Sequence, residues 1–254
     1  MRRLSVFRPL GLACAALFLA HCGDNGGPFG GDRWRGTLVP ATGSGPAGVI
    51  VWGNATGTPG GVYNNLFDHF AASGYTVISP NDSLTGDGET MVEALDWVLA
   101  AGERSGSSVY GKIDPKKVVV MGHSQGGASA VVVAGKDSRV AALVSLMPDC
   151  NFWVRCNNTA SIRAPSLLIA GSTDILVRER TVRDVYDKLS GPAALATIDG
   201  LGHMGWFSDQ VNSIGRPVTE FLDGALGDGS LAKFKNSTCR DCGTKTWKMT
   251  TKNL

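Results

Sequence analysis

From residue 47 onward, short apolar runs alternate with longer amphipathic stretches. The runs lack a polar face, as expected for parallel strands that are buried on both sides, and the stretches between them have the apolar spacing of helices. The expected strands are 48–52, 75–79, 118–122, 141–147, 166–171 and 194–198, with an edge strand at 35–39. The expected helices are 60–73, 89–103, 124–134, 179–189 and 210–226. This order predicts an α/β fold with a mostly parallel sheet and helices on both faces.

Length and charge restrict the domain count and the partners. The chain has 254 residues, of which 43% are hydrophobic and 18% charged, enough for one substantial core. No internal repeat follows residue 32, so we expect a single domain over 33–254 that ends in a polar, lysine-rich tail at 227–254. The net charge is +2 and most lysines and arginines are scattered, so nucleic acid is not an expected partner.

The N-terminus predicts export. A basic start precedes an apolar stretch over 9–20, which has the length and flanks of a secretory signal and is too short for a permanent membrane span. Residues 19–22, LAHC, resemble the bacterial lipobox, in which the cysteine, here Cys22, is lipidated; the histidine departs from the small residue usual there. Plain cleavage is the alternative. Either way, residues 23–32 form a flexible tether, and we expect a secreted or envelope-anchored bacterial protein.

Four cysteines remain outside the signal, and export places them in an oxidising compartment. They are Cys150, Cys156, Cys239 and Cys242. Two disulfides are expected, and pairing of near neighbours is the simplest of three connectivities, among which the sequence does not choose. The C-x-x-C spacing at the second pair is also found in redox and zinc sites, but export and the lack of a second ligand pair nearby argue against both. No metal site is therefore expected.

One glycine-bounded serine stands where an apolar run stops. Residues 122–126 read GHSQG, with the apolar 118–121 before them and small residues after them. In the pattern G-x-S-x-G the serine occupies a strained strand-to-helix turn that exposes its hydroxyl, and the glycines avoid collisions with neighbouring backbone. An ordinary glycine-rich turn is the alternative. The nucleophile interpretation of Ser124 therefore requires an acid and a histidine further along the chain.

Both partners follow in the required order. Asp174 comes directly after the strand expected at 166–171, and His203 lies in a glycine-bearing loop after the last expected strand. Functional groups of open α/β sheets gather at the carboxyl ends of the strands, so these residues can meet Ser124. A serine hydroxyl needs a base to take its proton and a carboxylate to orient that base. Ser124, His203 and Asp174 are thus the candidate triad.

The alternatives to these partners are few. The other three histidines lie in the signal, in an amphipathic helix, and inside the turn itself, where the side chain of His123 is expected to point away from the pocket. Asp149 and Asp199 compete for the role of the acid. The first adjoins a cysteine expected to be bridged, and the second is too near His203 in sequence, so Asp174 is preferred.

An acyl-transfer serine also needs two N–H donors for the oxyanion of the tetrahedral intermediate. The backbone amide of Gln125, directly after the nucleophile, is one. The second is expected in the loop 53–57, where Asn54 is preferred over Ala55. That loop is not a phosphate site, because no P-loop lysine follows it and no G-x-G-x-x-G pattern occurs.

Together these segments resemble the α/β-hydrolase superfamily, and within it the compact secreted group of bacterial cutinases, polyester hydrolases and chlorophyllase-like or dienelactone-hydrolase-like esterases. The resemblance covers about 49–226 and rests on VIVWGN at 49–54, GHSQGG at 122–127, LIAGSTD at 168–174 and GH at 202–203. It implies the α/β-hydrolase fold, and no insertion here is long enough for a large lid. The motifs are specific for the superfamily and less so for a substrate.

The resemblance also suggests which residues contact substrate. Polyester hydrolases usually carry an aromatic residue in the oxyanion loop and a methionine after the nucleophile; this chain has Asn54 or Ala55, and Gln125, which weakens a polyesterase assignment. A tryptophan after the strand that follows the nucleophile helix is another family feature, and Trp153 is similarly placed. Trp153 and Trp206 are therefore candidates to line an apolar acyl pocket, with ordinary packing as the alternative, and Ala55 is a further candidate for substrate contact.

The expected function is that of a secreted serine carboxylic ester hydrolase that acts through an acyl-enzyme on short to medium acyl esters. A cutinase or polyester hydrolase that acts on polymer surfaces is the nearest alternative, and a catalytically silent binding module with a hydrolase fold is an alternative of another class. Small or polymeric esters are the expected partners, beside the lipid anchor considered above. We expect a monomer without a cofactor.

Overall fold

The structure is a computed structural model, and it describes residues 34–152, 154–227, 229–239 and 242–254. The expected signal, the tether and Cys22 lie outside these residues, as does Trp153. Across the described ranges, no helix combines the length and the apolar character that crossing a membrane requires.

A sheet of nine strands organises the described part of the chain, in the order β1-β3-β2-β4-β5-β6-β7-β9-β8. The pairs from β3 through β7 are all parallel, whereas β1, β9 and β8 join antiparallel at the two edges. The strands are β1 (Gly36–Val39), β2 (Ala47–Gly53), β3 (Tyr75–Pro80), β4 (Ile113–His123), β5 (Val140–Leu146), β6 (Ser166–Gly171), β7 (Ala193–Ile198), β8 (Thr238–Cys239) and β9 (Trp247–Lys252). The expected mostly parallel sheet is confirmed.

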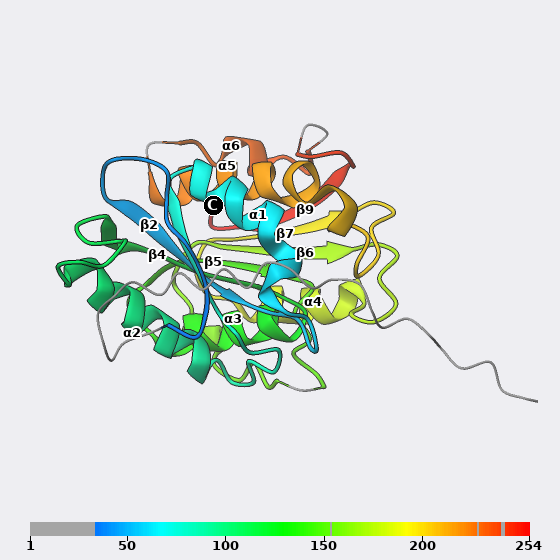
Figure 1. The fold of residues 1–254 in the computed structure, drawn as a ribbon. Coiled ribbons are helices and arrows are strands. Elements are labelled where there is room, and N and C mark those ends of the chain that lie inside the picture. The colour runs from blue at the N-terminus through cyan, green and yellow to red at the C-terminus, as the bar shows by residue number, and fades with distance from the viewer. Residues whose placement is uncertain (1–33, 153, 228, 240–241) are drawn as a thin grey trace, which may run out of the picture.

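Helices cover both faces of this sheet. Figure 1 shows α2, α3 and α4 on one side, and α1, α5 and α6 on the other. The α-helices are α1 (Asn64–Ala72), α2 (Glu89–Glu103), α3 (Gln125–Lys136), α4 (Glu179–Lys188), α5 (Arg216–Leu226) and α6 (Ala232–Lys235). Single turns add η1 (Gly60–Tyr63), η2 (Thr159–Ser161), η3 (Phe207–Asp209) and the π-helical η4 (Val211–Gly215). No large lid interrupts the described elements.

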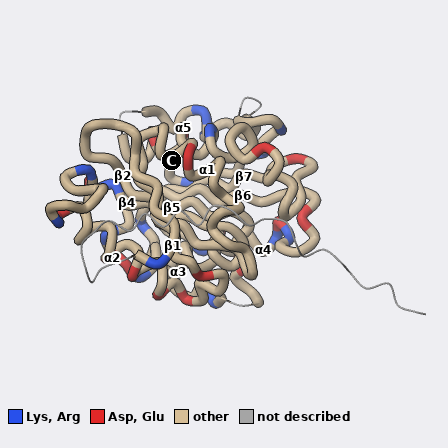
Figure 2. Tube along the Cα trace, viewed as in Figure 1, with Lys and Arg blue, Asp and Glu red and all other residues tan. Residues whose placement is uncertain are grey.

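The central strands form the core because both of their faces are covered. Every residue of β2, β3, β6 and β7 is buried, in keeping with their nearly continuous apolar sequences. Figure 2 shows the charged residues on the helices and loops that surround these strands, with both signs interspersed. The core is thus a layered, mostly apolar interior between the two sets of helices.

The C-terminal segment differs from the expected polar tail. Its residues Trp247–Lys252 form β9, which pairs antiparallel with β7 and brings Trp247 opposite Ile198. The reason is a period of two: Trp247 and Met249 are buried while Lys248 between them is exposed. The segment is an integral edge of the sheet, and its alternating pattern is the signal that the sequence analysis missed.

Candidate active site

Ser124 lies in a strained turn between β4 and α3. Its backbone has φ 57° and ψ −119°, a region that non-glycine residues rarely adopt. The turn is held by hydrogen bonds: the amide of Ser124 donates to the carbonyl of Leu146 (2.8 Å), and its own carbonyl accepts from the amides of Ala128 (3.0 Å) and Asp149 (3.1 Å). This is the geometry expected of a nucleophile elbow rather than of an ordinary glycine-rich turn.

The glycines of the motif are explained by direct backbone contact. A Cβ placed on Gly122 would lie 2.4 Å from the carbonyl oxygen of Gly126, and one on Gly126 would lie 2.1 Å from that of Gly53. Real Cβ atoms do not approach so closely, so only glycine lets the end of β2, the end of β4 and the start of α3 meet. The loop after β2 is thereby brought against Gly126, two residues after the serine.

Asp174 and His203 meet at the neighbouring strand ends. Oδ2 of Asp174 and Nδ1 of His203 are 2.7 Å apart, and the other carboxylate oxygen accepts from the amides of Leu176 (2.8 Å) and Val177 (2.9 Å). A carboxylate only accepts, so Nδ1 of His203 carries the proton and Nε2 is left to take another. Gly171 permits this approach, because a Cβ there would lie 2.3 Å from the carbonyl oxygen of Leu201 in the histidine loop.

The carboxylate is kept ionised by its partners. Burial by itself would raise the pKa of Asp174, but the hydrogen bond from His203 and those from the amides of Val177 and Leu176 hold that pKa below its ordinary value. The competing acids are engaged elsewhere: Asp199 pairs with Lys248 (2.8 Å), and Oδ1 of Asp149 accepts from the amide of Phe152 (3.3 Å). The arrangement can therefore orient an imidazole and stabilise its cation.

Ser124 and His203 both border one cavity of about 400 Å³. The remaining lining consists of four polar residues, Thr56, Asp149, Asn151 and Thr181, and three apolar residues, Phe152, Leu176 and Val177. Large apolar side chains lie exposed in the segments that follow β5, β6 and β7: Phe152, Ile175, Leu176 and Met204 have exposed fractions of 74%, 84%, 70% and 48%. We call these four residues the apolar rim.

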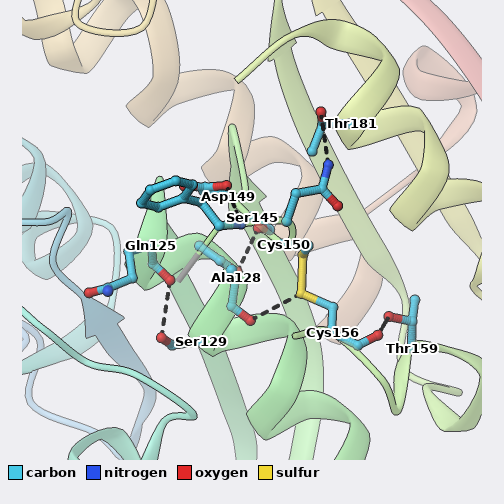
Figure 3. The surroundings of a disulfide bond; sticks show 12 residues. Gln125, Ala128, Ser129, Ser145, Asp149, Cys150, Cys156, Thr159 and Thr181 are labelled. Atoms are coloured by element: carbon cyan, nitrogen blue, oxygen red, sulfur yellow. Dashed lines mark hydrogen bonds between the residues drawn. A yellow bond between two sulfur atoms is a disulfide. The ribbon is translucent and has the colours of Figure 1, made fainter. Parts of the chain in front are cut away.

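A disulfide shapes the segment that carries Asp149 and Phe152. Cys150 and Cys156 are bridged, with Cα atoms 5.4 Å apart, and Figure 3 shows the bridge beside Ala128 of α3. Sγ of Cys156 lies 3.7 Å from the carbonyl oxygen of Ala128; since a disulfide sulfur has no hydrogen, this is a packing contact. Cys239 and Cys242 are bridged as well, so the structure has the local pairing that the sequence left open.

The oxyanion-loop residues are placed in different ways. The side chain of Asn54 is fully buried and turned into the protein, because its Nδ2 donates to the carbonyls of Pro80 (2.9 Å) and Asp82 (3.0 Å). Only its backbone amide is left as a candidate donor. Ala55 is also buried, its amide donates to Oη of Tyr63 (3.3 Å), and its neighbour Thr56 lines the cavity instead.

The expected role of Trp206 in an acyl pocket is wrong. Its side chain is fully buried, stacked on Tyr63 with ring centroids 6.0 Å apart, and it is not part of the cavity wall. The ring packs inside the protein against Tyr63, His123 and Phe207, so the packing alternative holds. The sequence analysis missed Leu176 and Phe152 as wall residues, although apolar residues in loops directly after strand ends are the signal that would have found them.

Among the described residues, no group of three or more histidine, cysteine or acidic side chains is placed to hold a metal ion.

A strained serine elbow, an aspartate–histidine pair at the next strand ends and a mostly parallel sheet between helices define an α/β-hydrolase. The chain matches the family model described as PET hydrolase-like over residues 39–216, and it belongs to that family. It is a carboxylic ester hydrolase of the serine type.

The chain is similar to several named proteins. Cutinase 2 of Thermobifida cellulosilytica is 28% identical over 185 residues, which make up 69% of this chain and 68% of that protein. Cutinase cut1 of Thermobifida fusca is 28% identical over 185 residues, with 69% of this chain and 56% of that protein covered. Chlorophyllase-1, chloroplastic, of Citrus sinensis is 28% identical over 104 residues, 38% of this chain and 31% of its own. The resemblance to cutinases and chlorophyllase-like esterases is confirmed.

Proposed function

We propose that the chain hydrolyses carboxylic esters through an acyl-enzyme, with Ser124 as the nucleophile, His203 as the general base and Asp174 as the residue that orients it. Ser124 Oγ attacks the ester carbonyl carbon while Nε2 of His203 takes the hydroxyl proton; the tetrahedral intermediate then expels the alcohol, which receives that proton. Water attacks the acyl-enzyme by the same steps and frees the acid. The observation that carries the proposal is the 2.7 Å bond between His203 and Asp174 beside the strained serine.

The backbone amides of Gln125 and Asn54 hold the oxyanion in this proposal. Gln125 begins α3, so its amide is one of the unpaired donors at a helix N-terminus, where the helix dipole also favours negative charge. The close approach of Gly126 to the carbonyls of Gly53 and Asn54 supports a common site for the two amides, since it keeps the two segments in contact. Donors fixed before the reaction stabilise the developing charge without reorganisation.

We infer that short to medium acyl esters are the main substrates, because the cavity is small and most of its lining residues are polar. The apolar rim favours a second candidate, the surface of a polyester or cutin, since exposed apolar patches are typical of contact sites. Relatives named as cutinases agree with this second candidate. Both substrate classes would be cleaved by the same proposed triad. They differ in whether a small ester or a polymer surface contacts the apolar rim.

For the ends of the chain, we propose export as a single domain over 33–254, with the signal ending near Cys22 and lipidation of that cysteine as the anchor. The test is mass spectrometry of the N-terminus of the protein from its native host. An acylated Cys22 is the expected result. A free N-terminal residue other than acylated Cys22 would contradict the anchor and leave plain secretion.

The decisive experiment for the reaction is hydrolysis of p-nitrophenyl esters from acetate to palmitate by the mature protein and by Ser124→Ala. We expect activity in the first and none in the second, and labelling of Ser124 by a fluorophosphonate. The chain-length profile, followed by polyester film with and without Leu176→Ser and Phe152→Ser, separates the two substrate classes. Equal rates for the mature protein and Ser124→Ala would refute the proposed function.

A further inference from the structure

Two fully buried side chains outside the proposed triad connect its parts. Tyr63, at the end of η1, and His123, at the end of β4, have no exposed surface. Oη of Tyr63 and Nδ1 of His123 are 3.2 Å apart, and Nε2 of His123 is 3.1 Å from the backbone carbonyl oxygen of His203. The amide of Ala55 donates to the same Tyr63 Oη at 3.3 Å.

The donors and acceptors of these three hydrogen bonds follow from the chemistry of the groups. A carbonyl oxygen only accepts, so Nε2 of His123 must carry a proton and donate it to His203. With the imidazole neutral, Nδ1 is then the acceptor and Tyr63 Oη donates to it. Burial and the nearby His203 keep His123 neutral and lower its pKa to about 3, although the charge of Asp174 acts in the opposite direction. One tautomer satisfies every group.

Packing leaves these two rings little freedom. Trp206 stacks on Tyr63 and meets His123 edge-on, with the centroids of Trp206 and His123 5.2 Å apart. The imidazoles of His123 and His203 lie 4.7 Å apart between centroids. Trp206, which the sequence assigned to the acyl pocket, thus packs against both Tyr63 and His123.

We propose that Tyr63 and His123 are positioning residues for the reaction: through their hydrogen bonds they hold the backbone of His203 and the loop at Ala55 in register with the nucleophile elbow. This inference rests on the proposed function. His123 adjoins Ser124 in sequence. Its hydrogen bond to the carbonyl of His203 therefore connects the backbone next to the nucleophile with the backbone of the base. Misplacement of a base by a fraction of an ångström slows proton transfer while leaving substrate binding unchanged.

The test uses Tyr63→Phe, which keeps the packed ring and deletes one hydroxyl, with Tyr75→Phe as the matched control. Tyr75 is also buried, but it begins β3 at the opposite end of the sheet. Steady-state rates with p-nitrophenyl butyrate are divided by the number of active sites titrated with a fluorophosphonate, so any misfolded fraction does not count. We expect kcat per site to fall about tenfold in Tyr63→Phe with KM within about twofold, and no change in the control.

A second pair of variants separates positioning from packing. His123→Gln keeps an amide N–H near the place of Nε2 and is expected to retain more of kcat than His123→Leu, which has no donor. Long-range ¹H–¹⁵N spectra of the wild type are expected to show His123 protonated on Nε2 and bare on Nδ1, and Tyr63→Phe is expected to keep this tautomer, because the carbonyl of His203 still requires a donor.

Three outcomes would overturn the inference: an Nδ1–H tautomer of His123 in the wild type, a kcat per site for Tyr63→Phe equal to that of the control, or equal kcat in His123→Gln and His123→Leu. A wild-type protein that is not labelled by the fluorophosphonate and does not hydrolyse esters refutes the proposed function instead. The tautomer of His123 in the same sample then still tests the hydrogen bonds from Tyr63 to His123 and from His123 to His203.

Discussion

Acidification is expected to destabilise the fold through His123 before Asp174 is protonated. In the folded protein burial lowers the pKa of His123 from 6.5 to about 3, whereas the unfolded chain titrates near the ordinary value. At a pH between these two pKa values, His123 is protonated in the unfolded state and neutral in the folded state. The free energy of unfolding therefore decreases as pH falls through 6.5 and stops changing only near the folded pKa.

The size of this effect follows from the two pKa values. Each pH unit between them costs about 1.4 kcal/mol, so lowering the pH from about 7.5 to about 5 removes roughly 2 kcal/mol through this one residue. That is a large share of the marginal stability of a typical domain, about 5–15 kcal/mol. Asp174 adds nothing in this window, because its pKa is held below its ordinary value and its contribution is lost only in stronger acid.

The measurement is urea unfolding followed by tryptophan fluorescence at several pH values, for the wild type and for His123→Gln. The variant is expected to be less stable at neutral pH but to lose about 2 kcal/mol less on acidification. His69→Gln is the control: burial also lowers the pKa of His69, yet that side chain is only partly buried, so its difference should be smaller.

Parallel pH dependence in the wild type and His123→Gln would refute this reasoning. So would direct titration of the His123 ring protons by NMR with a midpoint above about pH 5, since a group that ionises there is not excluded from water as the packing requires. The NMR titration does not depend on how well the variant folds.

Other predictions address the site itself. Asp174→Asn is expected to lower kcat by about 10³–10⁴-fold with little change in KM, because the imidazole loses the acceptor that selects its tautomer; steady-state kinetics at neutral pH test this. Asp149→Asn removes a carboxylate from the cavity wall and should raise kcat/KM for an ester with a free carboxylate, such as p-nitrophenyl hydrogen succinate, about fivefold relative to the butyrate, from about 1 kcal/mol of repulsion; an unchanged ratio contradicts it. Replacing Cys150 and Cys156 by serine should lower the free energy of unfolding by about 2 kcal/mol, as expected for so short a loop, and raise KM by loosening the cavity wall. Denaturation and kinetics of the double variant test this, and unchanged KM would show that the bridge does not shape the site.

Much of this protein could be read from local sequence. The apolar runs of β2, β6 and β7 predict strands because every side chain of a doubly covered strand must be apolar. The glycines around Ser124 predict an elbow because only glycine tolerates backbone contact at both flanks. The order of Asp174 and His203 after successive strands follows from topology, since parallel strands end on the same edge.

Only the tertiary structure decided which groups touch. Sequence could not place Trp206 against Tyr63 and His123 rather than in the pocket, nor join Tyr63 to His123 across sixty positions. It also missed β9, which is a strand because β7 offers it an edge and a surface that buries Trp247. The physical reason is common to all three: local patterns register whether a side chain is apolar or a backbone flexible, whereas burial and hydrogen-bond partners depend on segments that meet only after the chain has folded.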